Sequence, residues 1–141
     1  MNRLPGVISA IESNAHLSLV DVRVGQDTFT AMLMETPQGA PYLKVGNAVA
    51  VLFKETEVSL AKNLSGQISL RNRIKGTVRH IRHGEILSEV VLDCQGVTVT
   101  SIITARAVKR LELAKGDEVV ALVKANEVAL MEIGSADEVA Q

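Results

Sequence analysis

Apolar and polar residues alternate in short runs along most of the chain, and turn-forming residues separate the runs. The segments 76–84, 87–94 and 97–104 show this alternation and are rich in Val, Ile and Thr. These residue types fit the pleated, half-buried surface of a strand. Gln95-Gly96 stands between the second and third segments as a turn signal. The pattern predicts three consecutive strands.

After residue 104 the spacing of the apolar residues changes from strand-like alternation to helical spacing. Residues 104–116, TARAVKRLELAKG, place Ala105, Val108 and Leu111 at helical spacing and end at a glycine. That spacing predicts a short helix. The following segment, DEVVALVKANEVALMEI, predicts two more strands joined near Asn126. Three strands, a short helix and two strands are the order of a small closed β-barrel of the OB type.

The chain matches itself without a gap after a shift of seventy positions. Identical pairs include Asn2/Asn72, Arg3/Arg73, Gly6/Gly76, Gly46/Gly116 and Lys54/Lys124. A repeat over a whole unit indicates two copies of one structure. We therefore predict a mainly β protein of two tandem OB-like barrels, each with a short helix. The predicted boundaries are 1–62 for the first, degenerate repeat, 63–68 for a linker, 69–133 for the second repeat and 134–141 for a flexible tail.

The helix of the first repeat is predicted to be the weaker one. Thr36-Pro37 is a good helix start, because proline suits the first helical position. Gly39 and Pro41 follow at once and shorten any helix that begins there.

Composition places the chain among globular proteins, with 47% hydrophobic residues, 22% charged residues and a formal net charge of −1. A balance this close to neutral does not favour broad attraction to nucleic acid or to a membrane surface. No apolar run approaches the roughly 18 residues of a membrane span, and we recognise no secretory signal. We expect a cytoplasmic protein in which Cys94, the single cysteine, is buried.

We find no catalytic set in the sequence and predict no enzyme. His80 and His83 would face opposite sides of a strand, and neither has a Cys or carboxylate partner at metal-binding spacing. We therefore expect no metal-cation site.

The polar residues at the strand ends of the second repeat indicate a different chemistry. Ser69, Arg71 and Asn72 precede its first strand, Thr104 stands between strand and helix, and Lys124 follows a strand. If these ends meet, they offer hydroxyl and amide donors and two cations, which suits a tetrahedral oxyanion. On the residues alone, an alternative is that Thr104 is only a helix N-cap and that Arg71 and Lys124 are solvated.

The segments SLRNRIKGTV, SEVVL and TSIITARAVKRLELAKGDEVVALVKANEVAL resemble the molybindin, or Mop/TOBE, family. The resemblance covers essentially all of the second repeat. The first repeat resembles the family more loosely, at NRLPGVISAIE, KVGNAVAVLFK and TEVSL. Together the repeats resemble tandem di-Mop proteins.

This arrangement is found in free-standing cytoplasmic molybdate-binding proteins and in the effector half of a molybdate-responsive repressor. The resemblance implies cytoplasmic binding of molybdate or tungstate at interfaces between OB-like domains, for storage, buffering or sensing. It implies no further cofactor. It also implies a homo-oligomer, for which we expect a trimer before a dimer. The implied ligand set is Ser69, Arg71, Asn72, Thr104, Lys124 and, through its backbone, Ala125.

Several positions depart from the family pattern. In the second repeat Leu70 replaces the usual Ala, and Ala107 stands where many relatives have a serine hydroxyl. In the first repeat Met1, Met34 and Glu55 replace the equivalents of Arg71, Thr104 and Ala125. A carboxylate beside a dianion is repulsive. We therefore expect at most a weaker site in the first repeat, built from Lys54 and Thr56.

Two other functions stay open at this point. One is a regulatory or scaffold module with weak or lost anion binding that acts through a partner such as a molybdate transporter. The other is OB-type nucleic-acid binding through Arg71, Arg73, Lys75, Arg79 and Arg82. Single-strand binding on this fold relies on aromatic stacking, and the chain has only Phe29, Tyr42 and Phe53, so we expect no nucleic-acid partner.

Overall fold

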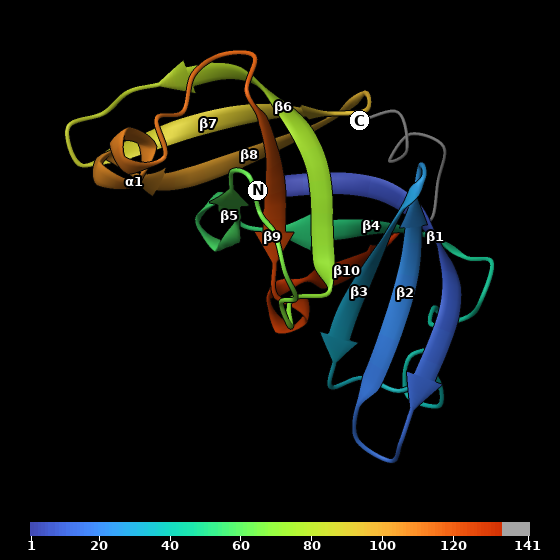
Figure 1. Cartoon of the computed structure of the whole chain (residues 1–141). Coiled ribbons are helices and arrows are strands. Elements are labelled where there is room, and N and C mark those ends of the chain that lie inside the picture. Colours follow the sequence, from blue (N-terminus) through green and yellow to red (C-terminus); the bar gives the residue numbers. More distant parts are fainter. Residues whose placement is uncertain (134–141) are drawn as a thin grey trace. The chain divides into compact units, whose positions relative to one another are not determined.

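A computed structural model describes residues 1–133, and the statements below concern that range. The described chain consists mainly of antiparallel strands (Figure 1), so the predicted mainly β fold is confirmed. The tail predicted to be flexible, 134–141, lies outside the described residues.

The second repeat follows the predicted order of three strands, a short helix and two strands, although Asn72, expected before the first of these strands, begins it. The first repeat contains β1 (Asn2–Ser13), β2 (Ser18–Val24), β3 (Asp27–Leu33), β4 (Ala48–Phe53), a 3₁₀-helix η1 (Glu55–Glu57) and β5 (Ser59–Ala61). The second contains β6 (Asn72–Arg82), β7 (Leu87–Cys94), β8 (Val97–Thr104), α1 (Ala105–Arg110), β9 (Glu118–Val123), a 3₁₀-helix η2 (Ala125–Glu127) and β10 (Ala129–Glu132). The predicted turn at Gln95-Gly96 is confirmed, and both residues have positive φ angles, 58° and 89°.

The short α-helix predicted for the first repeat is wrong. The corresponding segment, 35–47, contains turns only. The N–H groups of Gly39 and Ala40 both donate to the carbonyl of Thr36, which closes one turn. The turn does not continue as a helix because Pro41 has no N–H to donate.

The strands form two five-stranded sheets, and each sheet takes an outer strand from the other repeat. The orders are β10-β4-β1-β2-β3 and β5-β9-β6-β7-β8. Leu130 of β10 lies opposite Val51 of β4, and Leu60 of β5 lies opposite Ala121 of β9. These two registers are related by the same shift of seventy positions. The repeats therefore exchange their final strands in equivalent ways.

Because of this exchange, the compact units differ from the sequence repeats. Within the described residues, one unit contains Arg3–Phe53 together with residues 124–133, and the other contains Lys54–Val123 together with Asn2. The buried Asn2 side chain donates to the carbonyl of Thr100 and accepts from its N–H, both at 2.8 Å. The boundaries at 62 and 69 stay a prediction about the sequence repeats, and each compact unit draws on both repeats.

Each unit has its own apolar core. In the first unit Val20, Val22, Phe29 and Phe53 are at most 1% exposed, and the two phenyl rings stack with centroids 5.8 Å apart. The core of the second unit includes Val78, Val90, Leu92 and Val99, also at most 1% exposed. These residues are the apolar members of alternating strands, whose inward positions recur every second residue.

A close approach between β6 and β7 explains the glycine shared by the repeats at positions 6 and 76. A Cβ at Gly76 would lie 2.7 Å from the sulfur of Cys94 and 3.3 Å from the carbonyl oxygen of Asp93. Gly6 is equally crowded by Val22 and the Arg23 carbonyl. Cys94 itself is buried, as predicted.

We expect Gly76→Ala to destabilise the protein by about 1–3 kcal/mol, the usual cost of overpacking a well-filled interior. Chemical denaturation measures the loss. Gly39→Ala is the matched control, because the nearest atom to its added Cβ would be 4.0 Å away. Equal stability of the two variants would contradict the close approach of β6 and β7.

Tyr42, the single tyrosine, lies in the turn segment of the first unit. Its hydroxyl donates to the Glu35 carboxylate at 2.9 Å. Burial raises the pKa of Tyr42 to about 12, helped by the Glu35 hydrogen bond and by the charges of Glu35 and Glu132. Proton binding is therefore tighter in the folded state than in the unfolded state.

The chain has no tryptophan to interfere with absorbance at 295 nm. We expect the absorbance at this wavelength to report a single phenol titration near pH 12 in the folded protein. Because the pKa of Tyr42 is raised on folding, its contribution to stability is fully present below pH 10, the ordinary phenol value, and is lost as the pH rises towards 12. Glu35→Gln should lower the pKa of Tyr42. Titration of folded protein near 10 would contradict this environment.

Candidate functional site

The predicted ligands Ser69, Arg71 and Asn72 lie at the start of β6, in the second unit. Ser69 and Arg71 are exposed in the segment before the strand. Asn72 begins β6, pairs with Val123 of β9 and is only 1% exposed. Its repeat equivalent, Asn2, uses its side chain to hold a strand backbone, so an asparagine here has a structural use besides ligand binding.

Thr104 ends β8 and is the N-cap of α1. Its hydroxyl oxygen accepts the N–H of Ala107 at 3.0 Å, so the N-cap role considered from the sequence is confirmed. The same hydroxyl keeps its own proton for donation, and the residue is exposed. Capping and anion binding are therefore compatible at Thr104. Ala107 supplies a backbone donor to the cap but no side-chain hydroxyl.

Lys124 and Ala125 belong to the first unit. Lys124 is exposed and directly follows β9, one residue after Val123. The carbonyls of Lys124 and Ala125 accept from Glu127 and Val128 within and just after η2. A carbonyl is only an acceptor, so the backbone group of Ala125 suited to an anion is its N–H. η2 packs against β3, which ends one residue before Met34.

The residues predicted for a weaker first-repeat site belong to the second unit. Lys54 and Thr56 are exposed at η1, and Glu55 between them is partly exposed. η1 packs against β8, and the hydroxyl of Ser101 on β8 donates to the carbonyl of Val58 at 2.7 Å. Strand exchange thus brings the segment with Lys54 against the strand that ends in Thr104.

The predicted residues are therefore grouped by unit and not by repeat. The second unit contains Ser69, Arg71, Asn72, Thr104, Lys54 and Thr56, and the first unit contains Lys124 and Ala125. Sequence reasoning alone grouped Lys124 with Thr104, because it assigned each repeat to one barrel.

Sequence reasoning missed a lysine–aspartate pair that braces α1. Lys62 donates from Nζ to the carbonyls of Leu111 and Glu112, at 3.1 and 2.9 Å, and to Asp117 Oδ2 at 3.0 Å. The same Asp117 oxygen accepts the N–H of Ala114 at 2.9 Å. A cation here satisfies carbonyls beyond the last turn of a helix that is only six residues long. The sequence signal was a change of charge at both equivalent positions of the other repeat, where Glu132 reverses the charge of Lys62 and Asn47 removes that of Asp117.

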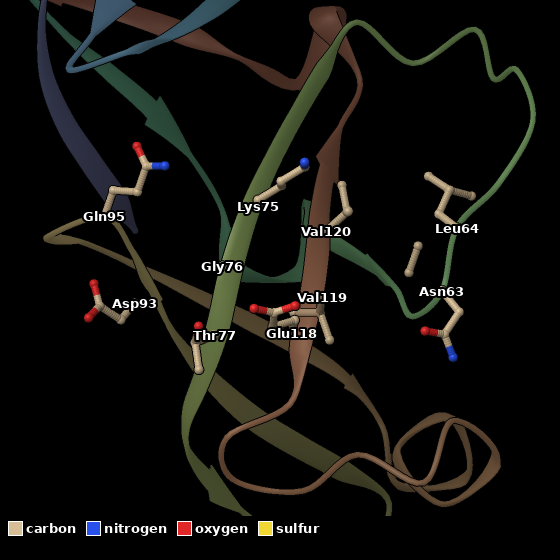
Figure 2. Close-up of a pocket in the computed structure, with 11 residues that line it drawn as sticks. Asn63, Leu64, Lys75, Gly76, Thr77, Asp93, Gln95, Glu118, Val119 and Val120 are labelled. Carbon is tan, nitrogen blue, oxygen red and sulfur yellow. The ribbon is translucent and has the colours of Figure 1, made fainter.

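A cavity of about 730 Å³ lies elsewhere in the second unit, between residues of the linker and the strands β6 and β9 (Figure 2). Its charged lining residues are Lys75, Asp93 and Glu118. None of the predicted ligands lines it, and two carboxylates against one ammonium do not favour an oxyanion. We do not assign the anion site to this cavity.

Two features are absent from residues 1–133. No helix in this range has the length and apolar character needed to cross a membrane. The same range contains no group of three or more His, Cys, Asp and Glu side chains placed to hold a metal ion.

Comparison with known proteins decides the family. A family model described as "TOBE domain" matches residues 68–130. The crystal structure of ModG, a cytoplasmic molybdate-binding protein with molybdate bound, aligns with a TM-score of 0.88 and 33% identity, over 94% of this chain and 96% of ModG. This chain belongs to the Mop/TOBE family. The predicted pair of OB-like domains agrees with the ModG match.

Two curated relatives show the range of this Mop/TOBE family. The molybdenum transport protein ModE of Herbaspirillum seropedicae is 32% identical over 127 residues, which are 88% of this chain and 47% of ModE. Molybdenum-pterin-binding protein 1 of Clostridium pasteurianum is 38% identical over 65 residues, 45% of this chain and 96% of the relative. This chain spans less than half the length of ModE and of several other curated relatives that it matches.

We expect an acid titration of Asp117 to reveal the Lys62–Asp117 pair that braces α1. The hydrogen bond from Lys62 is the main cause of a lowered pKa at Asp117, with the Ala114 N–H second. Because this pKa is lowered on folding, the pair's stabilisation is present above the ordinary aspartate value of 3.8 and is lost as the pH falls below it. NMR titration of the Asp117 carboxyl should show a midpoint below 3.8 that rises in Lys62→Met. An unchanged midpoint in that variant would contradict the brace.

Proposed function

We propose that this chain binds molybdate, or tungstate, reversibly in the cytoplasm and so stores, buffers or senses the oxyanion. The observation that carries the proposal is the match to molybdate-bound ModG over nearly the whole of both chains. Exposed Thr104 and Lys124, at the ends of β8 and β9, supply the residue types that the family pattern requires.

Binding uses hydrogen bonds and charge and involves no covalent step, so the proposed activity is not enzymatic. The first unit offers the Lys124 ammonium and the Ala125 N–H as donors, and the second unit offers the Thr104 hydroxyl, with Arg71 and Ser69 as further candidates. Hydrogen bonds to a charged group are about twice as strong as neutral ones. Donors at strand ends, where the backbone is already ordered, lose little freedom when the anion binds.

Each compact unit carries one unfavourable substitution for this chemistry. In the first unit η2, with Lys124 and Ala125, packs against the strand that leads to Met34. In the second unit Thr104 is present, and η1, packed against its strand, carries Glu55. We propose that Lys124 contributes most to affinity and that Lys54, with Thr56, contributes to a weaker site. We further propose a homo-oligomer, a trimer before a dimer.

Calorimetric titration with molybdate tests the function. We expect micromolar or tighter binding, little response to sulfate, and a loss of at least about tenfold in affinity in Lys124→Ala, the usual scale for one charged hydrogen bond. Lys44→Ala is the matched control, because it removes one exposed lysine from the same unit. Light scattering on the same samples measures the oligomer.

The results separate the binding function from the roles of Lys124 and Lys54. Equal losses in Lys124→Ala and Lys44→Ala would reject Lys124 as a ligand while leaving anion binding intact. A lowered stoichiometry in Lys54→Ala would support the weaker site. No heat and no thermal shift at millimolar molybdate would reject the binding function and leave the regulatory or scaffold module as the better hypothesis.

A further inference from the structure

The two exchanged strands present nearly the same surface to the sheets that they join. β5 reads Ser-Leu-Ala and β10 begins Ala-Leu-Met, with Leu60 and Leu130 at equivalent register positions. Their partners are also apolar, β4 throughout and β9 from Val119 to Val123. Backbone pairing and apolar contacts therefore distinguish poorly between a correct and an incorrect strand at either sheet edge.

The next position along each strand carries opposite charges. Lys62 follows β5 directly, and Glu132 is the equivalent residue at the end of β10. In the second unit the Lys62 ammonium is surrounded by the Leu111 and Glu112 carbonyls and the Asp117 carboxylate. All three are acceptors. A carboxylate at this place would find no donor among them and would face Asp117.

The equivalent position in the first unit discriminates much less between a lysine and a glutamate. Glu132 lies opposite Val49, and Asn47 takes the position of Asp117. The Asn47 side chain is neutral and donates to the Tyr42 carbonyl at 2.9 Å. The Tyr42 hydroxyl occupies the Glu35 carboxylate. Discrimination between the two strands therefore depends on the second unit.

We propose that Lys62 and Asp117, with the Leu111 and Glu112 carbonyls, sort the two final strands, so that the edge of β9 accepts β5 and rejects β10. If the edge of β9 rejects β10, the pairing of both exchanged strands is determined. Once β5 occupies β9, the edge of β4 is left for β10. The pair is thus a specificity determinant of the exchange as well as a brace for α1.

Two cysteine reporters measure which strand occupies β9, in the full chain with Cys94→Ala throughout. Ala61→Cys with Val120→Cys reports the observed pairing, since these residues are register partners. Met131→Cys with Val120→Cys reports the opposite pairing, because Met131 is the repeat equivalent of Ala61. Opposed residues on antiparallel strands lie within disulfide reach. Mild oxidation followed by peptide mass mapping gives the cross-linked fraction for each pair.

With the native charges we expect the 61–120 link to predominate and the 131–120 link to be a trace. Glu132→Lys leaves the Lys62 brace intact and gives both strands a cation, so we expect at least a tenfold rise in the 131–120 link. The exchanged pair Lys62→Glu with Glu132→Lys should make that link the major one, within one chain or between chains.

Lys62→Met is the control for simple destabilisation, since it removes the cation from β5 without placing one on β10. It should raise the 131–120 link less than Glu132→Lys does. An unchanged trace of that link in both charge variants would overturn the proposal and show that chain connectivity alone selects the strand. An equal rise in Lys62→Met and Glu132→Lys would also overturn it, because loss of the brace would then explain the effect.

Discussion

The open edges of β4 and β9 are the constraint on which the structure depends. Apart from Glu118 at the start of β9, both strands are apolar. Their outer backbone groups need a partner, because unpaired backbone donors and acceptors at a buried edge are costly. The short strands β10 and β5 supply these partners, and each comes from the opposite repeat. Neither repeat completes its own sheet, so in this chain each repeat depends on the other for its outer strand.

The same exchange governs the candidate site. The 3₁₀-helices η1 and η2 immediately precede the exchanged strands, so each travels with its strand into the other unit. This is why Lys124 is not in the same compact unit as Thr104, although both belong to the second repeat. Degeneration of the first repeat therefore affects both units, through Met34 in one and Glu55 in the other. Each unit is thus built from residues of both repeats.

Much of the fold could be predicted because it depends on local rules. Alternation specified β6, β7 and β8, the Gln95-Gly96 turn separated two of them, and helical spacing located α1. The family pattern likewise pointed to the ligand candidates, since it follows residue types at matching spacings. The first-repeat helix was predicted wrongly because Thr36-Pro37 favours a start, whereas Gly39 and Pro41 prevent continuation.

By itself, the sequence determined the repeat, the order of the strands along the chain, the glycine needed where β6 approaches β7, and the donor residues available for an oxyanion. Each of these follows from side-chain type and spacing. Only the tertiary structure decided which sheet receives β5 and which receives β10, because the two strands have almost the same apolar pattern. It also decided the partners of Lys62, which lie about fifty residues away in Leu111, Glu112 and Asp117. Long-range pairing of that kind depends on how the chain folds back, and residue spacing carries no record of it.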